Sequence, residues 1–591
     1  MAARRLGLIR RYLRPHRRTV LHGVVALVVV NLLSVSLPLL VRAVINDLQD
    51  GFAVSDVLRE AALIVALATL MGGVRLWSRM LVFGVGRQVE ADLKQRIFSH
   101  MLRQEPGWVQ RTGSGEVISR ATSDVENVRR LLGFAVLSLT NTALAYALTL
   151  PAMLAIDPWL SLAAVGLYPL MLLTVRLFGG RMMRQQRRQQ QSLASLSDLV
   201  QEDLSGISAI KIYGQETTER QAFAERNRAY RDDALQLART RSTLFPLLEG
   251  ISSVSLLLLL ALGSGQLESG RLSIGDLVAL ILYVERLVFP TALLGFTLNT
   301  FQTGQVSLER VEELLQRRPR IESPAEPLPA AARPGASATP GCGAAIEARD
   351  LTIRYDGAER DALRGLSFKL QPGELVAVVG PVGCGKTTLA RALGRMVEVP
   401  AGQLFLDGRD VTALGLKNLR EQVAFVPQEG YLFTASLADN LRYGEPDADQ
   451  QRVEQAALQA RLEGDIRGFP DGYRTLVGER GITLSGGQRQ RTALGRALLV
   501  EAPLLVLDDA LASVDNNTAA EILASVRRQN DRTVLMISHQ LSAAAACDRI
   551  LVLEDGRLVQ QGHHRDLVAQ SGTYRRLWER EQAEQQLSRA A

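Results

Sequence analysis

The 591-residue chain has 47% hydrophobic and 22% charged residues, and its mean hydropathy is +0.06. A water-soluble α/β protein rarely has a positive mean hydropathy, so the composition excludes a wholly soluble chain and predicts segments in lipid. The formal charge is +7, but aromatic and basic residues do not interleave as they do in single-strand nucleic-acid binders. Three cysteines without metal-ligand spacing exclude a disulfide framework and a zinc site.

The N-terminal region combines a basic start with a long apolar stretch. Residues 1–18 contain seven arginines and no acid, and residues 20–45 are apolar apart from isolated polar side chains. About 20 apolar residues span a bilayer. The stretch is too long for a signal peptide and lacks a small-residue cleavage site. The positive-inside rule then places the N-terminus in the cytoplasm.

Five more apolar stretches follow, at residues 61–84, 131–156, 159–178, 244–263 and 277–296. The loops between them are uneven, because residues 86–130 and 181–241 are long, charged and helical in pattern. From a cytoplasmic start both long segments fall on the cytoplasmic side, where the arginine-rich second one belongs. The sequence therefore predicts an α-helical transmembrane domain with six spans.

The rest of the chain has the pattern of a linker and a soluble domain. Residues 321–341 are rich in Pro, Ala and Gly without apolar periodicity, which is typical of a flexible linker. From residue 346 strands and helices alternate, which predicts an α/β domain with a largely parallel sheet. We expect the transmembrane domain at residues 1–320, the linker at 321–344, the α/β domain at 345–580 and a charged tail at 581–591.

A phosphate-binding motif follows the apolar strand at residues 375–379. The motif GPVGCGKT lies between that strand and a helical segment, which is the context of a P-loop. Glycines let the backbone curl around phosphate oxygens, the lysine reaches the β- and γ-phosphates, and the next hydroxyl reaches magnesium. The pattern predicts an ATP site made of Gly380, Pro381, Val382, Gly383, Cys384, Gly385, Lys386, Thr387 and Thr388.

Further downstream, a second glycine-containing turn precedes a strand that ends in acids. The turn opens a helix, whose free backbone N–H groups suit an anion, and its residues are Leu484, Ser485, Gly486, Gly487 and Gln488. The apolar run at residues 504–507 ends in Asp508 and Asp509. A strand ending in an acid is where an α/β nucleotide-binding fold holds magnesium.

Together these motifs resemble the nucleotide-binding domain of ABC transporters. The resemblance implies that Tyr355 stacks on adenine, that Gln428 senses the γ-phosphate and that His539 is the switch histidine. Asp515 matches the D-loop, and residues 475–481 resemble a loop found only in the exporter branch. The implied cofactors are ATP and Mg²⁺, with the metal held by Thr387, Gln428 and Asp508 and catalysis carried by Asp509, His539 and Gln428.

The membrane part resembles the exporter-type ABC membrane domain, in which each long cytoplasmic loop turns in a short coupling helix. The resemblance places the first coupling region at residues 112–128, with Gly115 and Glu116. It places Ile212 and Tyr213 in the second, as the plug into the ATPase domain. The alternative is that both segments are solvated amphipathic helices.

In this family an LSGGQ turn closes over the ATP of a second, facing ATPase domain. A chain with one such domain is therefore implied to work as a dimer with two composite sites. The family's acidic strand normally ends Asp-Glu, and the glutamate orients the attacking water, whereas this chain has Asp509. The carboxylate of the shorter side chain falls about 1–1.5 Å short of the water, and a misplacement near 1 Å can cost on the order of a hundredfold in rate.

Two assemblies are compatible with this departure. The pattern resembles the weak subunit of an asymmetric heterodimer, whose intact LSGGQ completes the site of a partner half-transporter. The alternative is a homodimer with a slow aspartate base, and the presence of His539 and Tyr355 supports it.

Two adjacent charges, Glu285 and Arg286, lie inside the sixth apolar stretch. Charges at membrane depth are costly and usually face a cavity or a partner. They are therefore expected either to line a substrate cavity or to pair with another helix.

The sequence thus predicts one half of an exporter that uses ATP to move amphipathic small molecules or lipids across the bacterial cytoplasmic membrane by alternating access. The N-terminus and the ATPase domain are expected in the cytoplasm, and no nucleic-acid partner is expected. A homodimeric flippase or multidrug exporter and a non-transporting ATP-binding regulatory subunit are the alternatives.

Overall fold

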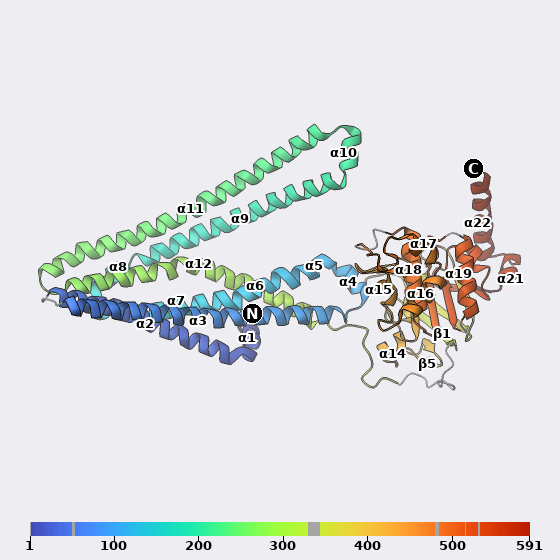
Figure 1. The fold of residues 1–591 in the computed structure, drawn as a ribbon, viewed down its shortest axis with the longest axis horizontal. Coiled ribbons are helices and arrows are strands. Elements are labelled where there is room, and N and C mark those ends of the chain that lie inside the picture. Colours follow the sequence, from blue (N-terminus) through green and yellow to red (C-terminus); the bar gives the residue numbers. More distant parts are fainter. Residues whose placement is uncertain are drawn as a thin grey trace. The chain divides into compact units, whose positions relative to one another are not determined.

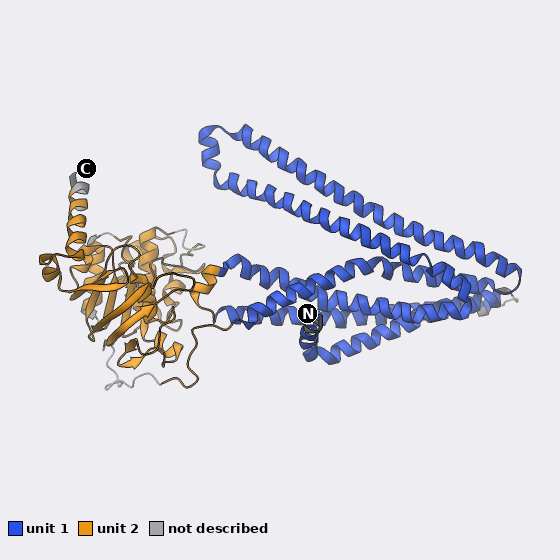
Figure 2. Cartoon of the chain, turned by 180° about the vertical axis from the view of Figure 1, so that it is seen from behind, with its two compact units in different colours: residues 1–102, 112–317 blue, residues 103–111, 318–591 orange. Residues whose placement is uncertain are grey.

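The computed structural model describes residues 2–49, 54–328, 343–478, 484–514, 516–529 and 532–590. The chain divides into two compact units (Figure 1), which have different colours in Figure 2. Unit 1 comprises residues 1–102 and 112–317, and unit 2 comprises residues 103–111 and 318–591. Asp515, part of the exporter-type loop and most of the predicted linker lie outside the described residues.

Unit 1 is built of helices. Among the described residues, six are long and apolar enough to cross a membrane, at Gly7–Leu48, Val57–Met101, Ser114–Ile156, Pro158–Ser205, Glu216–Glu268 and Ile274–Gln316. The predicted six-span helical domain is thus confirmed. Its elements are α1 Ala2–Leu13, η1 Arg14–His16, α2 Arg17–Gln49, α3 Val54–Met101, α5 Ser114–Ser119, η2 Arg120–Asp124, α6 Val125–Arg130, η3 Leu131–Ala135, α7 Val136–Ile156, α8 Pro158–Val165, α9 Tyr168–Ser205, α10 Ile207–Tyr213, α11 Glu216–Glu268 and α12 Ile274–Gln316.

Short polar caps start two of the membrane helices. At α8 the carboxylate of Asp157 accepts a hydrogen bond from the backbone N–H of Leu160 at 2.7 Å, and Pro158 occupies the first turn. At α12 Ser273 and Asp276 form a capping box, in which each side chain accepts from the other residue's backbone. These caps satisfy backbone donors that would otherwise lack partners at the helix starts.

The helices of unit 1 pack closely where small residues allow it. Helices α9 and α11 run side by side, joined by α10 (Figure 1). The π-helical segment η3 packs against α12, where a Cβ added at Gly304 would collide with the Leu131 side chain. Ser307 of α12 donates a hydrogen bond of 2.6 Å to Asp124 of η2. Small and hydrogen-bonding residues therefore hold the third and sixth spans together.

Unit 2 is an α/β domain with two sheets, so the predicted fold class is also confirmed here. A six-stranded sheet has the order β10-β9-β3-β8-β7-β6 and is parallel except for its edge strand β10, and a four-stranded antiparallel sheet has the order β2-β1-β4-β5. The strands are β1 Ile346–Ile353, β2 Leu363–Leu370, β3 Leu375–Val379, β4 Leu404–Leu406, β5 Arg409–Asp410, β6 Val423–Val426, β7 Leu504–Asp508, β8 Thr533–Ile537, β9 Arg549–Glu554 and β10 Arg557–Gly562.

Helices surround these sheets. They are α4 Pro106–Thr112, α13 Lys386–Leu393, α14 Leu416–Arg420, α15 Leu437–Arg442, α16 Gln450–Gln459, α17 Glu463–Gly468, η4 Gly472–Arg474, α18 Gly486–Leu499, α19 Asn516–Gln529, α20 Leu541–Ala544, α21 His564–Ala569 and α22 Thr573–Ala590.

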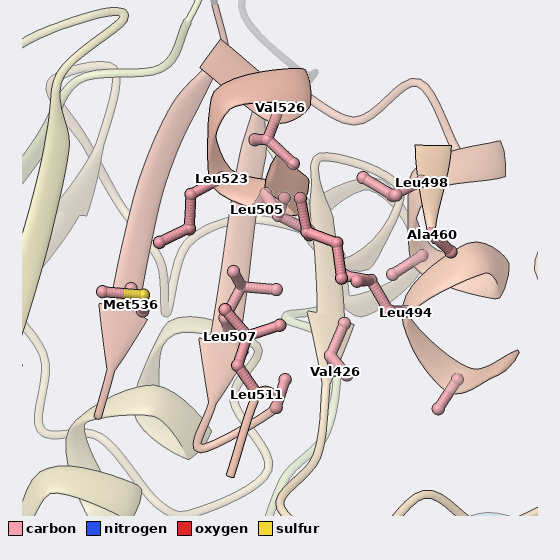
Figure 3. Close-up of a cluster of buried hydrophobic side chains, with 14 of the residues drawn as sticks. Val426, Ala460, Leu494, Leu498, Leu505, Leu507, Leu511, Leu523, Val526 and Met536 are labelled. Atoms are coloured by element: carbon pink, nitrogen blue, oxygen red, sulfur yellow. The ribbon is translucent and has the colours of Figure 1, made fainter. Parts of the chain in front are cut away.

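The central parallel strands are buried on both faces, which explains why the sequence shows continuous apolar runs there. Alternate residues of β7 enter different clusters: Leu505 and Leu507 join one core, and Leu504 and Val506 join the other. Figure 3 shows the first core, in which side chains of α18 and α19 lie against those of β6, β7 and β8. The two cores fix the strand ends that carry the chemistry.

Candidate functional site

The P-loop begins where β3 ends, and three of its glycines have positive φ. These are Gly380 (φ 153°), Gly383 (φ 82°) and Gly385 (φ 102°). A Cβ at Gly380 would collide with the Leu553 carbonyl, and one at Gly385 with the Ala362 carbonyl. A Cβ at Gly383 would meet no atom within 4 Å. Two glycines thus let the loop pack on neighbouring backbone, and the third leaves open space that suits an approaching phosphate.

Lys386 is folded back onto the loop that it closes. Its Nζ donates hydrogen bonds to the carbonyl oxygens of Gly380 at 2.8 Å and Pro381 at 2.9 Å, and the residue is only 5% exposed. Cys384 beside it is also buried, and burial raises the pKa of its thiol. By contrast, Val382 at the loop tip is 91% exposed. The loop therefore already holds an ammonium group where phosphate oxygens would become its acceptors.

Thr387 and Asp508 bring two oxygen donors together beside the P-loop. The Thr387 hydroxyl donates to Asp508 Oδ1 at 3.0 Å, and Asp508 is 2% exposed. Burial raises the pKa of the Asp508 carboxyl, and the hydrogen bond from Thr387 opposes that shift. Mg²⁺ prefers hard oxygen ligands and usually binds one or two carboxylates plus substrate phosphates. The residues present therefore fit a magnesium ion that is completed by the nucleotide.

Tyr355 lies next to the helix that follows the P-loop. Its hydroxyl shares a hydrogen bond of 3.2 Å with the Thr388 hydroxyl, and its side chain is half-buried. The structure thus brings the predicted adenine-stacking residue to the predicted phosphate loop.

Asp509 has a left-handed backbone, with φ of 53°. Its N–H donates to the carbonyl oxygen of Ile537, at the end of β8, at 3.0 Å, and its Oδ1 accepts from the backbone N–H of His539 at 3.4 Å. The His539 side chain is exposed. Two of the three predicted catalytic residues, Asp509 and His539, therefore lie side by side after adjacent parallel strands.

A carboxylate of the C-terminal helix caps the segment after His539. Glu581 of α22 accepts hydrogen bonds from the backbone N–H groups of Leu541 at 2.7 Å and Ser542 at 3.3 Å. These groups begin α20, and Gln540 and Ser538 are hydrogen-bonded to each other in the turn before it. The sequence predicted a charged tail from residue 581, but the contact of this tail with the histidine segment was missed.

Gln428 is exposed, and a glutamine of α18 connects its loop to the D-loop region. Gln490 Nε2 lies 3.5 Å from the Gln428 carbonyl oxygen, and Gln490 Oε1 accepts from the backbone N–H of Ser513 at 2.8 Å. No motif singled out Gln490, although it follows the LSGGQ turn directly on the same helix.

The LSGGQ turn is a fully formed helix start. Ser485 is the N-cap of α18, and its hydroxyl accepts from the backbone N–H of Gln488 at 3.3 Å while Gln488 Oε1 accepts from the backbone N–H of Ser485 at 2.9 Å. Gln488 Nε2 also donates a hydrogen bond to Asp465 Oδ1 at 2.9 Å. Leu484 is buried, and a Cβ at Gly487 would come within 2.9 Å of the Ser513 carbonyl oxygen.

In the described part of the chain, no hydrogen bond or ion pair joins residues 484–488 to the P-loop of the same chain. The backbone N–H groups of Gly486 and Gly487, in the first turn of α18, therefore stay available to an anion from elsewhere.

The predicted coupling residues lie in unit 1. Gly115 and Glu116 are on α5, and Ile212 and Tyr213 end α10 with 78% and 75% of their surfaces exposed. Residues 103–111, which precede the predicted first coupling region in the sequence, belong to unit 2 and not to unit 1. They contain most of α4.

The charged pair of the sixth span separates on α12. Glu285 is exposed and Arg286 is half-buried. Arg286 donates hydrogen bonds to Asn31 of α2 and forms no ion pair among the described residues.

A six-span helical domain and a P-loop domain in one chain define the class of nucleotide-driven membrane transporters. Two family matches agree with this architecture: the family described as "ABC transporter transmembrane region" matches residues 20–291, and the family described as "ABC transporter" matches residues 363–512. The chain belongs to the ABC transporter family, as a half-transporter of the exporter type. It is a multi-pass membrane protein with an ATPase domain.

Relatives match along almost the whole chain. The "Multidrug resistance-like ATP-binding protein MdlA" of Escherichia coli (strain K12) is 31% identical over 582 residues, covering 98% of this chain and 97% of the relative. The "ATP-dependent lipid A-core flippase" of Syntrophus aciditrophicus (strain SB) is 30% identical, covering 95% and 92%. A solved bacterial Atm1-family ABC exporter with ATP bound superposes with a TM-score of 0.76 at 26% identity, covering 96% and 98%. The predicted family and exporter fold are thus confirmed.

Proposed function

We propose that the protein exports amphipathic small molecules or lipids across the bacterial cytoplasmic membrane, as one half of a dimer that alternates between inward-open and outward-open states. The six spanning helices and the P-loop site support this proposal, together with relatives named for multidrug resistance and for lipid flipping. The N-terminus and the ATPase domain lie in the cytoplasm, consistent with the arginine-rich start of the chain.

The P-loop site binds ATP in this proposal. Lys386 exchanges its carbonyl acceptors for phosphate oxygens, and Tyr355 presents its ring to the adenine. Thr387, Asp508 and Gln428 would hold Mg²⁺, which neutralises charge on the phosphate oxygens when it is bound. The contact between Thr387 and Asp508 is the observation that carries this assignment.

A second chain completes each site. Ser485 and Gln488 hold the first turn of α18 open to an anion. No bond connects that turn to the P-loop of its own chain among the described residues, which supports a composite site with the turn from the partner. ATP then joins the two ATPase domains, and its hydrolysis releases them, a ligand-driven shift between two states.

Hydrolysis at the site built on Asp509 is slow in this proposal. Asp509 and His539 are adjacent, but aspartate is one methylene shorter than glutamate, and a water-orienting carboxylate displaced by about 1 Å loses on the order of a hundredfold in rate. A heterodimer follows, in which this chain's intact turn serves a partner with a normal glutamate. A homodimer with a slow base is the second candidate.

Exposed ends of the long helices transmit the closure to the membrane spans. Ile212 and Tyr213 are large apolar side chains that are three-quarters exposed in the single chain, as a docking plug requires. Gly115 and Glu116 on α5 form the other coupling segment in this proposal, and in the sequence they follow residues 103–111 of unit 2.

The test is ATP hydrolysis by the full chain alone in lipid nanodiscs. We expect negligible turnover in the parent and measurable turnover in Asp509→Glu, because the longer side chain reaches the water. Adding Lys386→Ala to Asp509→Glu should abolish it. Robust turnover of the parent that Lys386→Ala removes would instead identify a self-sufficient homodimer.

Asp350→Glu is the matched control. Asp350 also has a left-handed backbone, with φ of 51°, but it is exposed on β1, in the four-stranded sheet. It therefore reports the backbone cost of placing glutamate at such a position without altering the site. Its turnover should equal that of the parent.

A further inference from the structure

A polar cluster from three membrane helices surrounds Arg286. Nη2 of Arg286, on α12, donates to the Asn31 backbone carbonyl at 3.2 Å and to Asn31 Oδ1 at 3.0 Å, on α2. Asn31 Nδ2 donates to Asn141 Oδ1, on α7, at 3.1 Å and to the Leu27 carbonyl at 2.9 Å. Asn31 itself is 3% exposed. The guanidinium is thus oriented by a fixed, neutral partner.

The charge of this cluster is not balanced. Among the described residues no carboxylate pairs with Arg286, and its Nη1 is buried without a hydrogen-bond acceptor. Glu285 is the next residue on the helix, but consecutive helical residues do not face each other. Three helices therefore meet at a positive site to which the described residues supply no anion.

Helix packing does not account for the arginine. Tyr283, one turn earlier on α12, is fully buried and donates a 2.7 Å hydrogen bond to the Val35 carbonyl of α2, so α12 and α2 are already held together. An unpaired charge in a membrane span is costly and is seldom kept for structure alone. An acceptor group from outside the chain would satisfy both the charge and the free donor.

The surface beside the site is apolar. Phe289, three residues after Arg286, is on the same helix face and is 65% exposed. A ligand that meets the guanidinium with an anionic group therefore meets an aromatic side chain with its next atoms. This combination fits an amphiphile whose charged end is an anion.

We propose that Arg286, oriented by Asn31 and Asn141, binds the phosphate or carboxylate group of the transported amphiphile. The inference rests on the proposed export function and names its substrate class, an anionic rather than a cationic amphiphile. The apolar tail of the substrate contacts Phe289.

Equilibrium binding to the full chain in phosphatidylcholine nanodiscs tests this site without ATP turnover. The probe is radiolabelled dodecyl phosphate, with empty nanodiscs as the blank for partition into lipid. Arg286→Gln should weaken binding by about tenfold or more, as expected for loss of a charge-assisted hydrogen bond. Asn31→Asp should weaken it as well, because the new carboxylate takes the place of the ligand. Arg286→Lys should bind better than Arg286→Gln.

Arg176→Gln is the matched control, because Arg176 is an exposed arginine of the fourth span without a partner among the described residues. It should bind dodecyl phosphate like the parent, and so should Lys386→Ala, which excludes the ATP site as the binding place. Unchanged affinity in Arg286→Gln would overturn the proposal. So would tighter binding of dodecyltrimethylammonium than of dodecyl phosphate by the parent.

Further experiments distinguish a free anion from an amphiphile, and the proposed export function from the proposed Arg286 site. Inorganic phosphate that displaced the probe as well as unlabelled dodecyl phosphate would indicate a free-anion site and overturn the amphiphile assignment. Site-specific binding of dodecyl phosphate without any ATP-driven movement of it, in proteoliposomes that contain every partner needed for turnover, would contradict export while leaving the site in place. ATP-driven export of cationic amphiphiles only, unaffected by Arg286→Gln, would leave export in place and overturn the site.

Discussion

Asp509 combines a chemical and a conformational requirement at one position. Its φ of 53° is a region that Asp and Asn enter several times more often than other residues with side chains. Its carboxylate meanwhile accepts the backbone N–H of His539. A short polar side chain at the end of β7 therefore suits the left-handed backbone. Its carboxylate reaches less far toward an attacking water than the carboxylate of a glutamate would.

We expect Asp509→Asn and Asp509→Ala to differ in stability although both remove the charge. Asn tolerates the left-handed backbone, whereas Ala there costs about 1–2 kcal/mol. Thermal unfolding of the full chain in nanodiscs should therefore rank the parent and Asp509→Asn above Asp509→Ala. Equal stability of the two variants would show that the position carries no backbone strain.

At the scale of elements, α22 positions the segment that carries His539. Glu581 accepts hydrogen bonds from two backbone N–H groups at the start of α20, shortly after the predicted switch histidine, His539. We expect Glu581→Ala in the hydrolysing dimer, or in the Asp509→Glu background, to lower kcat by about tenfold, because the histidine loses its fixed place. KM for ATP should stay constant, since no hydrogen bond or ion pair joins Lys386 or Tyr355 to α22 in the described part of the chain.

The control for that variant lies on the same helix. Glu579 is exposed and, among the residues that the structure describes, pairs only with Arg575, so Glu579→Ala should leave kcat unchanged. Glu581→Gln keeps an oxygen acceptor and should restore part of the lost rate. A change in KM with constant kcat would mean that Glu581 acts on nucleotide binding instead.

The contact between α21 and α22 should make the stability of the fold sensitive to acid. His564 Nδ1 bonds the Tyr574 hydroxyl at 2.7 Å, and burial lowers the pKa of His564. The neutral ring is favoured in the fold, so its contribution is complete above the unfolded pKa of about 6.5 and is lost as the pH falls from there toward the lower folded pKa.

Unfolding temperatures at about pH 7.5 and about pH 5.5 measure this effect. The parent should lose more stability over that interval than His564→Gln, which cannot titrate. His563→Gln should behave like the parent, because His563 is exposed. Parallel losses in all three proteins would exclude His564 as the acid-sensitive group.

What the sequence predicted about these elements follows a physical rule. The P-loop and the LSGGQ turn were predicted because their chemistry is encoded in consecutive residues, and the six spans because each must be apolar over its whole length. Glu581 was missed because it lies in the same acidic and basic helical pattern as Glu579. Which of the two carboxylates meets α20 depends on tertiary packing. The Asn31–Arg286 contact was missed for the same reason, since 255 positions separate its residues.

On the scale of the whole molecule, the two units should respond differently to nucleotide. The residues proposed to bind ATP all belong to unit 2, whereas the spanning helices belong to unit 1. ATP at about 100 times its Kd adds about 2.7 kcal/mol to the state that binds it. Calorimetry of the full chain should therefore show one transition raised by Mg-ATP and one left in place. Lys386→Ala should remove the rise, and a rise in both transitions would mean that the units unfold as one.

The division of the chain also has a mechanical consequence. Because residues 103–111 belong to unit 2, the polypeptide crosses between the units three times, after α3, before α5 and after α12. The three crossings lead into the second, third and sixth spanning helices, so each of these helices is covalently continuous with unit 2. Cutting the chain between residues 328 and 343 would remove only one of these crossings.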